Sequence, residues 1–317
     1  MRFIRFLQIG QSNNTVIHDL ITNLNYVQSE FRFLFSDDVI EYPENVSLEQ
    51  PVPATTIELL AAKHAADKYP NEYPVAICDC PLQDELFTSY DEKLAVITTY
   101  SGIPEFSPYP VQSGIAYALI DILLGLYTAT PVHYQTRGCP MDYCDNKGDM
   151  SVGLAKCDFC SECRSQILHA VAQGEITLRQ VVAIYKILDF IAKRKICFVL
   201  MPFDKKFIRI YSSYLKPTLI EHDWKCSRAD EIYEPIEIMD LIWEQILRAD
   251  LVIADLTGRN PNVFYELGCA HALDKSTVLI TQSINDVPFD LRQRQLIEYS
   301  TTTQGYKKLT DSIAKYL

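Results

Sequence analysis

The sequence predicts an α/β protein of two parts, on three observations. Its 317 residues are enough for two domains. From residue 196 onward, short apolar runs alternate with segments of helical spacing, which is typical of a parallel sheet wrapped by helices. Before residue 136 strands and helices alternate less regularly, and five of the ten cysteines follow between residues 139 and 163. The first part is therefore expected to be α+β, with a cysteine-rich segment at its end.

The first part is expected to contain four strands, because four short runs are rich in β-branched and aromatic residues. Three further segments have the apolar spacing of helices. The predicted strands are 3–10, 31–37, 74–80 and 94–100, and the predicted helices are 14–25, 55–68 and 110–127. We predict a domain over 1–136, a cysteine-rich segment that closes it over 137–164, and a helical connector over 165–195 whose two pieces join near Gly174.

The second part, residues 196–317, is predicted to be a flavodoxin-like domain with five strands. Its apolar runs are continuous rather than alternating, as in strands that are buried on both faces. The predicted strands are 196–201, 224–230, 250–256, 276–282 and 296–300, and the predicted helices are 204–223, 235–249, 261–275 and 303–317. In such folds ligands bind beyond the carboxyl ends of the strands.

Composition excludes several classes of protein. The net charge of −12 disfavours broad binding to nucleic acid. No apolar run approaches 18 residues, so no membrane span or membrane partner is expected. The first residues have the period of a strand and lack the cleavage pattern of a signal peptide, so a cytoplasmic protein is expected.

The crowded cysteines indicate a metal rather than disulfides in a cytoplasmic chain. They form Cys139-x4-Cys144 and then Cys157-x2-Cys160-x2-Cys163. Two short chelating pairs separated by a loop can supply the four soft ligands that zinc prefers. We predict the ligands Cys139, Cys144, Cys160 and Cys163, and Cys157 remains a candidate to replace one of them. A site with four thiolates is closed, so this zinc is expected to be structural.

The stretch "AICDCPLQDELFTSYDEKLAVITTYSG" and the cysteine spacing that follows resemble the archaemetzincin metalloproteases over roughly residues 74–165. This resemblance implies a zincin-like domain with a structural zinc site. The helix that would carry the catalytic HExxH motif is "SGIAYALIDILLGLY", and none of the six histidines falls in that pattern. Without two imidazoles and a general base, a hydrolytic zinc cannot be held. The domain is therefore expected to serve in sensing or assembly, as a homo-oligomer or with a partner protein.

The residues just after the predicted strands of the second part are candidates for ligand binding. We expect substrate contacts from Met201, Pro202, Phe203, Arg228, Asp230, Gly258, Asn260 and Gln282. Asp255 also follows a strand. Asn260 is expected to cap the next helix, with Pro261 at its first position. Glu266 then lies one turn after Asn262 on the same helix face.

The segments "FVLMPF", "RADEI" and "ADLTGRNPNVFYELG" resemble the nucleoside 2-deoxyribosyltransferase-like group, a relative of TIR domains, over about residues 196–300. The resemblance implies that Glu266 is the catalytic carboxylate. It also implies that Asp255 and Asn262 orient the ribose or the glutamate, and that Met201–Phe203 and Trp243 form a wall for the base. Deoxyribosyltransferases carry an acidic residue six positions before the glutamate, where this chain has Asn260.

The expected function is therefore cleavage of the N-glycosidic bond of a nucleoside, nucleotide or NAD by Glu266. The transition state of this reaction resembles an oxocarbenium ion, which a carboxylate stabilises or traps. By resemblance to similar fusions, a role in bacterial anti-phage defence is expected. The alternative is a module that binds a nucleotide signal without turning it over.

Overall fold

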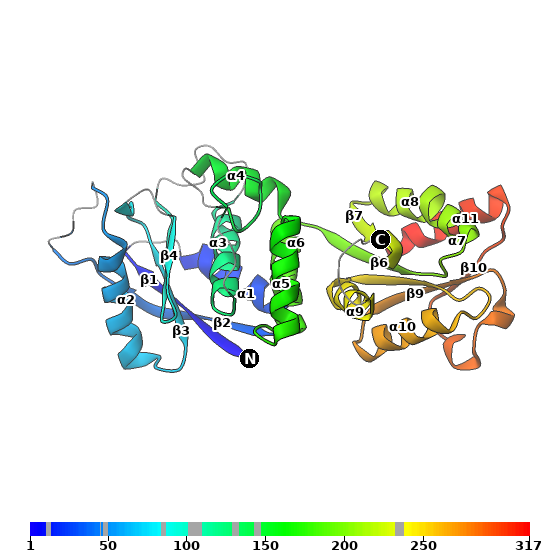
Figure 1. Ribbon diagram of the computed structural model, residues 1–317, viewed down its shortest axis with the longest axis horizontal. Coiled ribbons are helices and arrows are strands. Elements are labelled where there is room, and N and C mark those ends of the chain that lie inside the picture. The colour runs from blue at the N-terminus through cyan, green and yellow to red at the C-terminus, as the bar shows by residue number, and fades with distance from the viewer. Residues whose placement is uncertain are drawn as a thin grey trace. The chain divides into compact units, whose positions relative to one another are not determined.

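The computed structural model describes residues 1–10, 14–44, 46, 50–83, 87–100, 110–128, 133–142, 147–231 and 238–317. The chain divides into two compact units, Met1–Ala192 and Lys193–Leu317 (Figure 1). Each unit contains one five-stranded sheet with helices packed against it. The predicted α/β class is confirmed.

The sheet of the first unit has the strand order β2-β1-β3-β5-β4. Its strands are β1 (Arg2–Ile9), β2 (Phe31–Ile40), β3 (Tyr73–Cys78), β4 (Thr88–Tyr90) and β5 (Ala95–Thr98). Four of them are parallel, and β4 runs antiparallel to β5 at the edge. The sequence did not predict β4, because a strand of three residues is too short to show an alternating pattern.

Side chains of β1 alternate between the two faces of this sheet, and each face is covered by helices. Ile4 and Phe6 belong to a core that includes residues of α1, α3 and α6, whereas Leu7 and Ile9 pack with α2. The helices of the unit are α1 (Asn14–Val27), α2 (Ala54–Lys68), α3 (Val111–Gly125), α4 (Lys147–Lys156), α5 (Ser161–Gln173) and α6 (Leu178–Ile191). Successive side chains of β1 thus enter opposite cores, with the period of two that β-structure imposes.

The segment predicted as a connector belongs to the core of the first unit. Within residues 165–195, α5 ends at Gly174, whose φ of 75° is the left-handed conformation that terminates a helix. The next helix, α6, begins with a reciprocal cap between Thr177 and Gln180. It then packs beside α3 (Figure 1). Ile187 and Leu188 are fully buried, so the apolar face of α6 finds its partner within this unit.

The sheet of the second unit has the strand order β10-β9-β8-β6-β7, and every neighbouring pair is parallel. Its strands are β6 (Lys195–Leu200), β7 (Trp224–Ser227), β8 (Leu251–Asp255), β9 (Ser276–Thr281) and β10 (Leu296–Glu298). Numbered within the unit, the order is 2-1-3-4-5. This is the flavodoxin-like topology that the sequence predicted.

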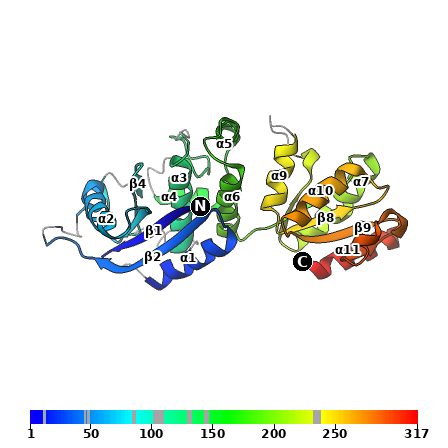
Figure 2. The same ribbon diagram turned by 90° about the horizontal axis from the view of Figure 1, so that it is seen from below.

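Helices cover both faces of this second sheet. The π-helical turn Tyr211–Leu215 joins α7 to α8, and these two helices share one apolar core with α11, while α9 and α10 share the other (Figures 1 and 2). The helices are α7 (Lys205–Ile210), α8 (Lys216–Glu221), α9 (Ile238–Arg248), α10 (Pro261–Ala272) and α11 (Thr303–Ile313). Among the described residues, none of the helices of either unit combines the length and apolar character needed to cross a membrane.

The neighbouring strands β6 and β8 form the switch point of the second sheet. The chain leaves β6 toward the α7 face and leaves β8 toward the α10 face. The two connections diverge at the carboxyl ends of adjacent strands. A parallel sheet offers its ligand crevice at this position.

Candidate functional site

A group of four metal-ligating side chains lies at the end of the first unit. His133, Cys139, Cys160 and Cys163 each offer one ligand atom, and these atoms all lie within 4.8 Å of one another. The Nε2 atom of His133 is 3.1 Å from the Sγ atoms of both Cys160 and Cys163. His133, Cys139 and Cys163 are buried.

Local backbone geometry holds the two halves of this group. Cys160 caps α5, and its Sγ accepts a hydrogen bond from the Cys163 backbone N–H at 3.5 Å. On the other half, one carboxylate oxygen of Asp142 accepts from the backbone N–H groups of Gly138 and Cys139 at 2.6 and 3.0 Å. Gly138 has a φ of 75°, so the turn that presents Cys139 favours glycine.

The donor set fits a structural zinc ion. Zinc–sulfur bonds of about 2.3 Å at tetrahedral angles place two sulfurs about 3.8 Å apart, which matches a group confined within 4.8 Å. Three cysteines and one histidine form a common set for zinc. Four protein ligands leave no open coordination position, so the metal would hold the fold together and supply no catalytic water.

The structure brings three of the four predicted zinc ligands together and adds His133 to them. Cys139, Cys160 and Cys163 come together as the spacing suggested, whereas Cys144 lies outside the described residues. Cys157 is buried away from the group and its thiol donates to the Leu154 carbonyl at 2.9 Å. His133 was missed, because five cysteines already exceeded the four places. Its position six residues before Cys139 was the signal that could have identified it.

The carboxyl edge of the second sheet carries the other candidate site, and Glu266 is its central residue. As predicted, Asn260 caps α10: its side-chain oxygen accepts from the backbone N–H groups of Asn262 and Val263 at 2.9 and 3.4 Å. The helix buries Val263, Leu267 and Ala270. Glu266 is half-buried beside that face.

The carboxylate of Glu266 accepts no hydrogen bond from any described residue. Burial alone raises its pKa from the usual 4.5 to about 7. A carboxyl group near neutrality that is not engaged in the fold is available to a ligand.

Glu266→Gln is expected to stabilise the protein at pH 8. The folded protein holds this proton more tightly than the unfolded chain, so wild-type stability falls as pH rises from 4.5 to about 7. If Glu266 were fully buried, its raised pKa would cost the ionised protein about 3 kcal/mol of unfolding free energy. Solvent screening reduces the gain expected from the amide to about 1–2 kcal/mol. Urea unfolding at pH 8 and pH 4.5 measures this gain, which should nearly vanish at the lower pH. Equal gains at both values would contradict the prediction.

Asp255, at the end of β8, holds the loop that leads into α10. It is fully buried, and its two oxygens accept from the Thr257 backbone N–H at 3.0 Å and from the Tyr299 hydroxyl at 2.6 Å. Gln282 completes the network by donating to Tyr299 at 2.9 Å and, through its backbone N–H, to Thr257 at 2.9 Å. Burial raises the pKa of Asp255. Its place in the structure suits a positioning residue rather than one that contacts a substrate.

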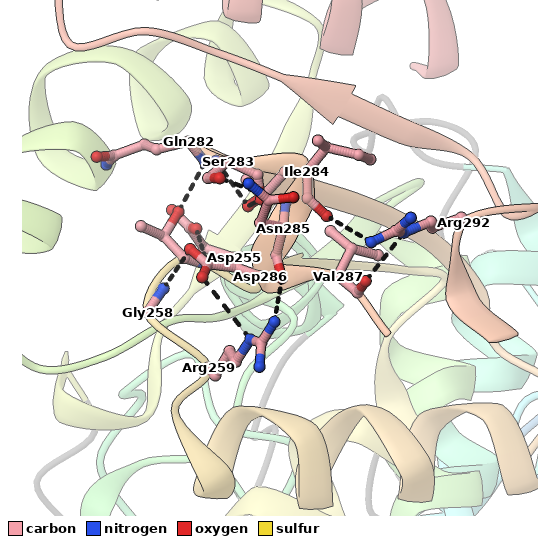
Figure 3. A network of polar contacts seen from close by, with 12 residues as sticks. Asp255, Gly258, Arg259, Gln282, Ser283, Ile284, Asn285, Asp286, Val287 and Arg292 are labelled. Atoms are coloured by element: carbon pink, nitrogen blue, oxygen red, sulfur yellow. Dashed lines mark hydrogen bonds and ion pairs between the residues drawn. The ribbon is translucent and has the colours of Figure 1, made fainter. Parts of the chain in front are cut away.

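The loop after β8 is tied to the loop after β9 by backbone and ionic contacts (Figure 3). Gly258 donates its backbone N–H to Asp286 at 2.9 Å, and the guanidinium of Arg259 lies 3.8 Å from the same carboxylate. Arg259 also donates to the Asn285 carbonyl. We name these residues, 257–259 with 285–286, the loop clasp.

The loops after β6 and β7 place Arg228 beside Phe203. Arg228 is almost fully buried and forms a two-pronged ion pair with Asp230, with 2.8 Å between Nε and Oδ1. Its guanidinium carbon lies 5.8 Å from the centre of the Phe203 ring, which is exposed. Met201 and Pro202, also predicted to contact substrate, are buried.

The remaining predicted residues are only partly gathered at this edge. Asn262 is exposed in the first turn of α10, and its backbone N–H serves the helix cap. Trp243 is half-buried on α9. The sequence predicted a role for Arg228 only from its place at the end of a strand. Its burial could not be foreseen from an edge strand of four residues.

No protein-family model matches the chain, and no curated protein matches it. Several solved structures are similar to it at low identity. Three of them are a zinc-dependent peptidase from Methanocorpusculum labreanum (15% identity, 52% of this chain, 99% of that chain, TM-score 0.39), the archaemetzincin from Methanopyrus kandleri (9%, 54%, 96%, 0.37) and the C-terminal domain of glucosamine-fructose-6-phosphate aminotransferase from Francisella tularensis (13%, 99%, 81%, 0.24). All three TM-scores are below 0.5, so these likenesses are distant.

Proposed function

We propose that the second unit cleaves the N-glycosidic bond of a nucleotide-type substrate, with Glu266 as the catalytic carboxylate. The observation that carries this proposal is the state of Glu266: half-buried, without a hydrogen-bond partner among the described residues, and with a pKa raised to about 7. The helix that carries it follows β8, at the switch point of the sheet.

The chemistry requires a carboxylate at the anomeric carbon. When the bond between C1′ and the base nitrogen breaks, its electron pair leaves with the base and positive charge develops on the sugar. The Glu266 carboxylate would stabilise that charge or bond to C1′. Water then supplies a hydroxyl to C1′, and its proton goes to the base or, where the base leaves as neutral nicotinamide, to the solvent. The products are the free base and the sugar.

The fold supports this proposal by fixing the loop that leads from β8 into α10, the helix that carries Glu266. Asp255 anchors Thr257 and Tyr299, and the loop clasp holds the next residues of the same loop. Phe203 presents an exposed ring after β6, where a base could stack. In this proposal the first unit, closed by its structural zinc site, serves in sensing or assembly.

The proposal is tested by incubating the full chain with nucleosides, their 5′-monophosphates, ATP and NAD, and separating the products by chromatography. Free base from at least one substrate is the expected result. A free sugar must appear in equal amount, because one bond is broken per turnover. If no base is released between pH 6 and 9, alone or after assembly, the proposed function is wrong.

The rate is expected to rise with pH through about 7. Only the ionised form of Glu266 can stabilise positive charge, and that form is roughly a tenth of the protein at pH 6 and about nine-tenths at pH 8. kcat/KM measured between pH 5 and 9 should therefore increase about tenfold per unit below pH 6.5 and level off above pH 7.5. A profile that falls across this range would assign Glu266 to proton donation instead.

One observation favours a second candidate, a module that binds a nucleotide without cleaving it. Asn260 stands where deoxyribosyltransferases carry an acid, and its side-chain oxygen is used to cap α10. Asp255 is likewise occupied by the fold. Nucleotide binding with no base release would support this candidate.

A further inference from the structure

We propose that Arg228 binds a phosphate group of the substrate, so that the second unit acts on phosphate esters rather than on bare nucleosides. This inference rests on the proposed function and specifies its substrate class. The inference rests on the Arg228 guanidinium, which is buried and held by three contacts. One of its nitrogen atoms has no hydrogen-bond partner among the described residues. Arg228 follows β7 at the carboxyl edge of the sheet, where the chain also leaves β8 toward the helix that carries Glu266.

Three contacts fix the orientation of the Arg228 guanidinium. Asp230 accepts from Nε and Nη2. The Tyr211 and Phe203 rings lie 5.2 and 5.8 Å from the guanidinium carbon. Tyr211 is itself anchored, because its hydroxyl donates to Glu231 at 2.6 Å. A guanidinium held in this way presents its remaining N–H groups in one direction.

The remaining nitrogen, Nη1, is buried and has no hydrogen-bond partner among the described residues. A buried charged donor without an acceptor is costly, and native structures seldom keep one without a functional reason. The acceptor that satisfies it best is an anionic oxygen, because hydrogen bonds from guanidinium to phosphate are charge-assisted.

The surrounding charges also favour an anion at Nη1. The Arg228 side chain is 1% exposed, whereas that of Asp230 is 31% exposed. The carboxylate is therefore screened by water more strongly than the guanidinium that it pairs with. Glu231, a second acid among the described residues that follow Arg228, accepts from Tyr211 and from Lys216 at 2.6 Å each.

Arg228 follows β7 at the same carboxyl edge of the sheet from which the chain leaves β8 toward α10. β7 and β8 both neighbour β6, and Ser227 and Val252 both align with Phe198. Arg228 follows Ser227 directly, so it lies about two strand spacings, roughly 10 Å, from the line of β8. A ribose 5-phosphate carries its phosphate at the end of the sugar opposite C1′. In this proposal the ester contacts Arg228 while C1′ faces Glu266.

In this proposal a movement of Phe203 gives a ligand access to Nη1. This ring is the exposed member of the pair that lies against Arg228, with 57% of its surface accessible. It follows β6 outside any helix or strand. In this arrangement the ring shields the guanidinium from water until a ligand displaces it.

The test measures binding to the full chain carrying Glu266→Gln, so that no ligand is turned over. Ribose, ribose 5-phosphate and ADP-ribose are titrated by calorimetry, because these sugars are common to substrates with any base. Ribose 5-phosphate or ADP-ribose is expected to bind at least tenfold more tightly than ribose. The two esters distinguish a mononucleotide from a dinucleotide source. If neither ester binds more tightly than ribose, the inference is overturned.

Two further variants assign the effect to Arg228. Arg228→Lys should reduce the affinity for the preferred ester at least tenfold, since lysine keeps the charge and loses the fixed fork. Lys195→Met removes an equal charge from the opposite end of β6 and should leave it unchanged. If Arg228→Lys fails to fold, Asp230→Asn replaces it. Asparagine keeps one side-chain oxygen that accepts from the guanidinium and removes the competing negative charge. Ester binding should therefore tighten severalfold, and weaker or unchanged binding would overturn the inference.

Failure of the inference and failure of the proposed function give different results. If wild-type protein releases base from a nucleoside as fast as from its 5′-monophosphate, Arg228 does not bind the phosphate of the substrate. The proposed enzyme activity would still be supported. If esters bind in a manner that depends on Arg228 and no base is released, the phosphate site stands and catalysis does not.

Discussion

Cys163→Ser is expected to prevent the first unit from folding stably. Structural zinc sites contribute roughly 10 kcal/mol of apparent binding free energy, which is comparable to the whole stability of a domain. Cys163 is fully buried and its Sγ lies 3.1 Å from His133 Nε2. Serine supplies a hard, weakly ionised ligand in its place. Metal analysis should show one zinc per wild-type chain and much less in the variant, with loss of the thermal unfolding transition of this unit.

Cys157→Ser is the matched control for this experiment. Cys157 is also buried and lies six residues earlier, but it is outside the ligand group, and serine can keep its hydrogen bond to the Leu154 carbonyl. This variant should retain its zinc. If both variants retain zinc and melt as wild type does, the four residues do not form the metal site. His133→Ala then separates the ligand sets, because loss of zinc in this variant identifies histidine as the fourth ligand.

Glu266→Gln is expected to lower the rate of base release by about a thousandfold or more. Removing one fixed electrostatic contact to a transition state costs about two to three orders of magnitude, and losing the central group costs more. Glutamine keeps the size of the side chain but cannot stabilise a positive charge at C1′. The loss should appear in kcat, while the affinity for ribose 5-phosphate changes little, because that product carries no positive charge at C1′.

Asp274→Asn is the matched control for Glu266→Gln. Asp274 is exposed just beyond the other end of α10, and asparagine tolerates its left-handed φ of 53°. The control makes the same change from acid to amide and should leave the rate within about twofold, because surface substitutions away from a site have small effects. If Glu266→Gln retains more than a tenth of wild-type activity, another group must carry the chemistry.

The second unit was predicted closely from sequence because each of its elements follows a simple rule. Buried parallel strands are continuous apolar runs, as in the "LVIAD" of β8, and the Asn260-Pro261 pair marks the start of α10. The alternation of strands and helices then leaves few topologies. Position relative to the sheet also predicted which loops would lie at the carboxyl edge.

The first unit was less predictable for reasons of pattern. The α4 helix was missed because most of its sequence, "KGDMSVGLAK", is polar or small, with Met150 and Leu154 as its buried apolar pair. The ligand His133 carries no pattern of its own. Its partners Cys160 and Cys163 lie 27 and 30 residues later, and only the folded chain brings them together.

The roles of individual residues at the sheet edge required three-dimensional information. Asp255 ends β8 and Glu266 lies in the helix that follows, and the resemblance implied catalytic roles for both. The structure distinguishes them, because Asp255 accepts two hydrogen bonds from the fold and Glu266 accepts none from the described residues. The hydrogen bond to Asp255 from Tyr299 could not be predicted from the sequence, because Tyr299 follows β10 and lies 44 residues further along the chain.

The loop clasp has a consequence for the thermodynamics of ligand binding. Gly258 and Arg259 are joined to residues 285–286 by contacts within the protein itself, so these two loops form one ordered rim. A ligand that settles against this rim does not have to order it, and the conformational entropy that binding would otherwise lose has already been lost during folding. Association on this side should therefore resemble docking to a rigid surface, with little change in hydrogen exchange at the backbone amides of Thr257 and Gly258.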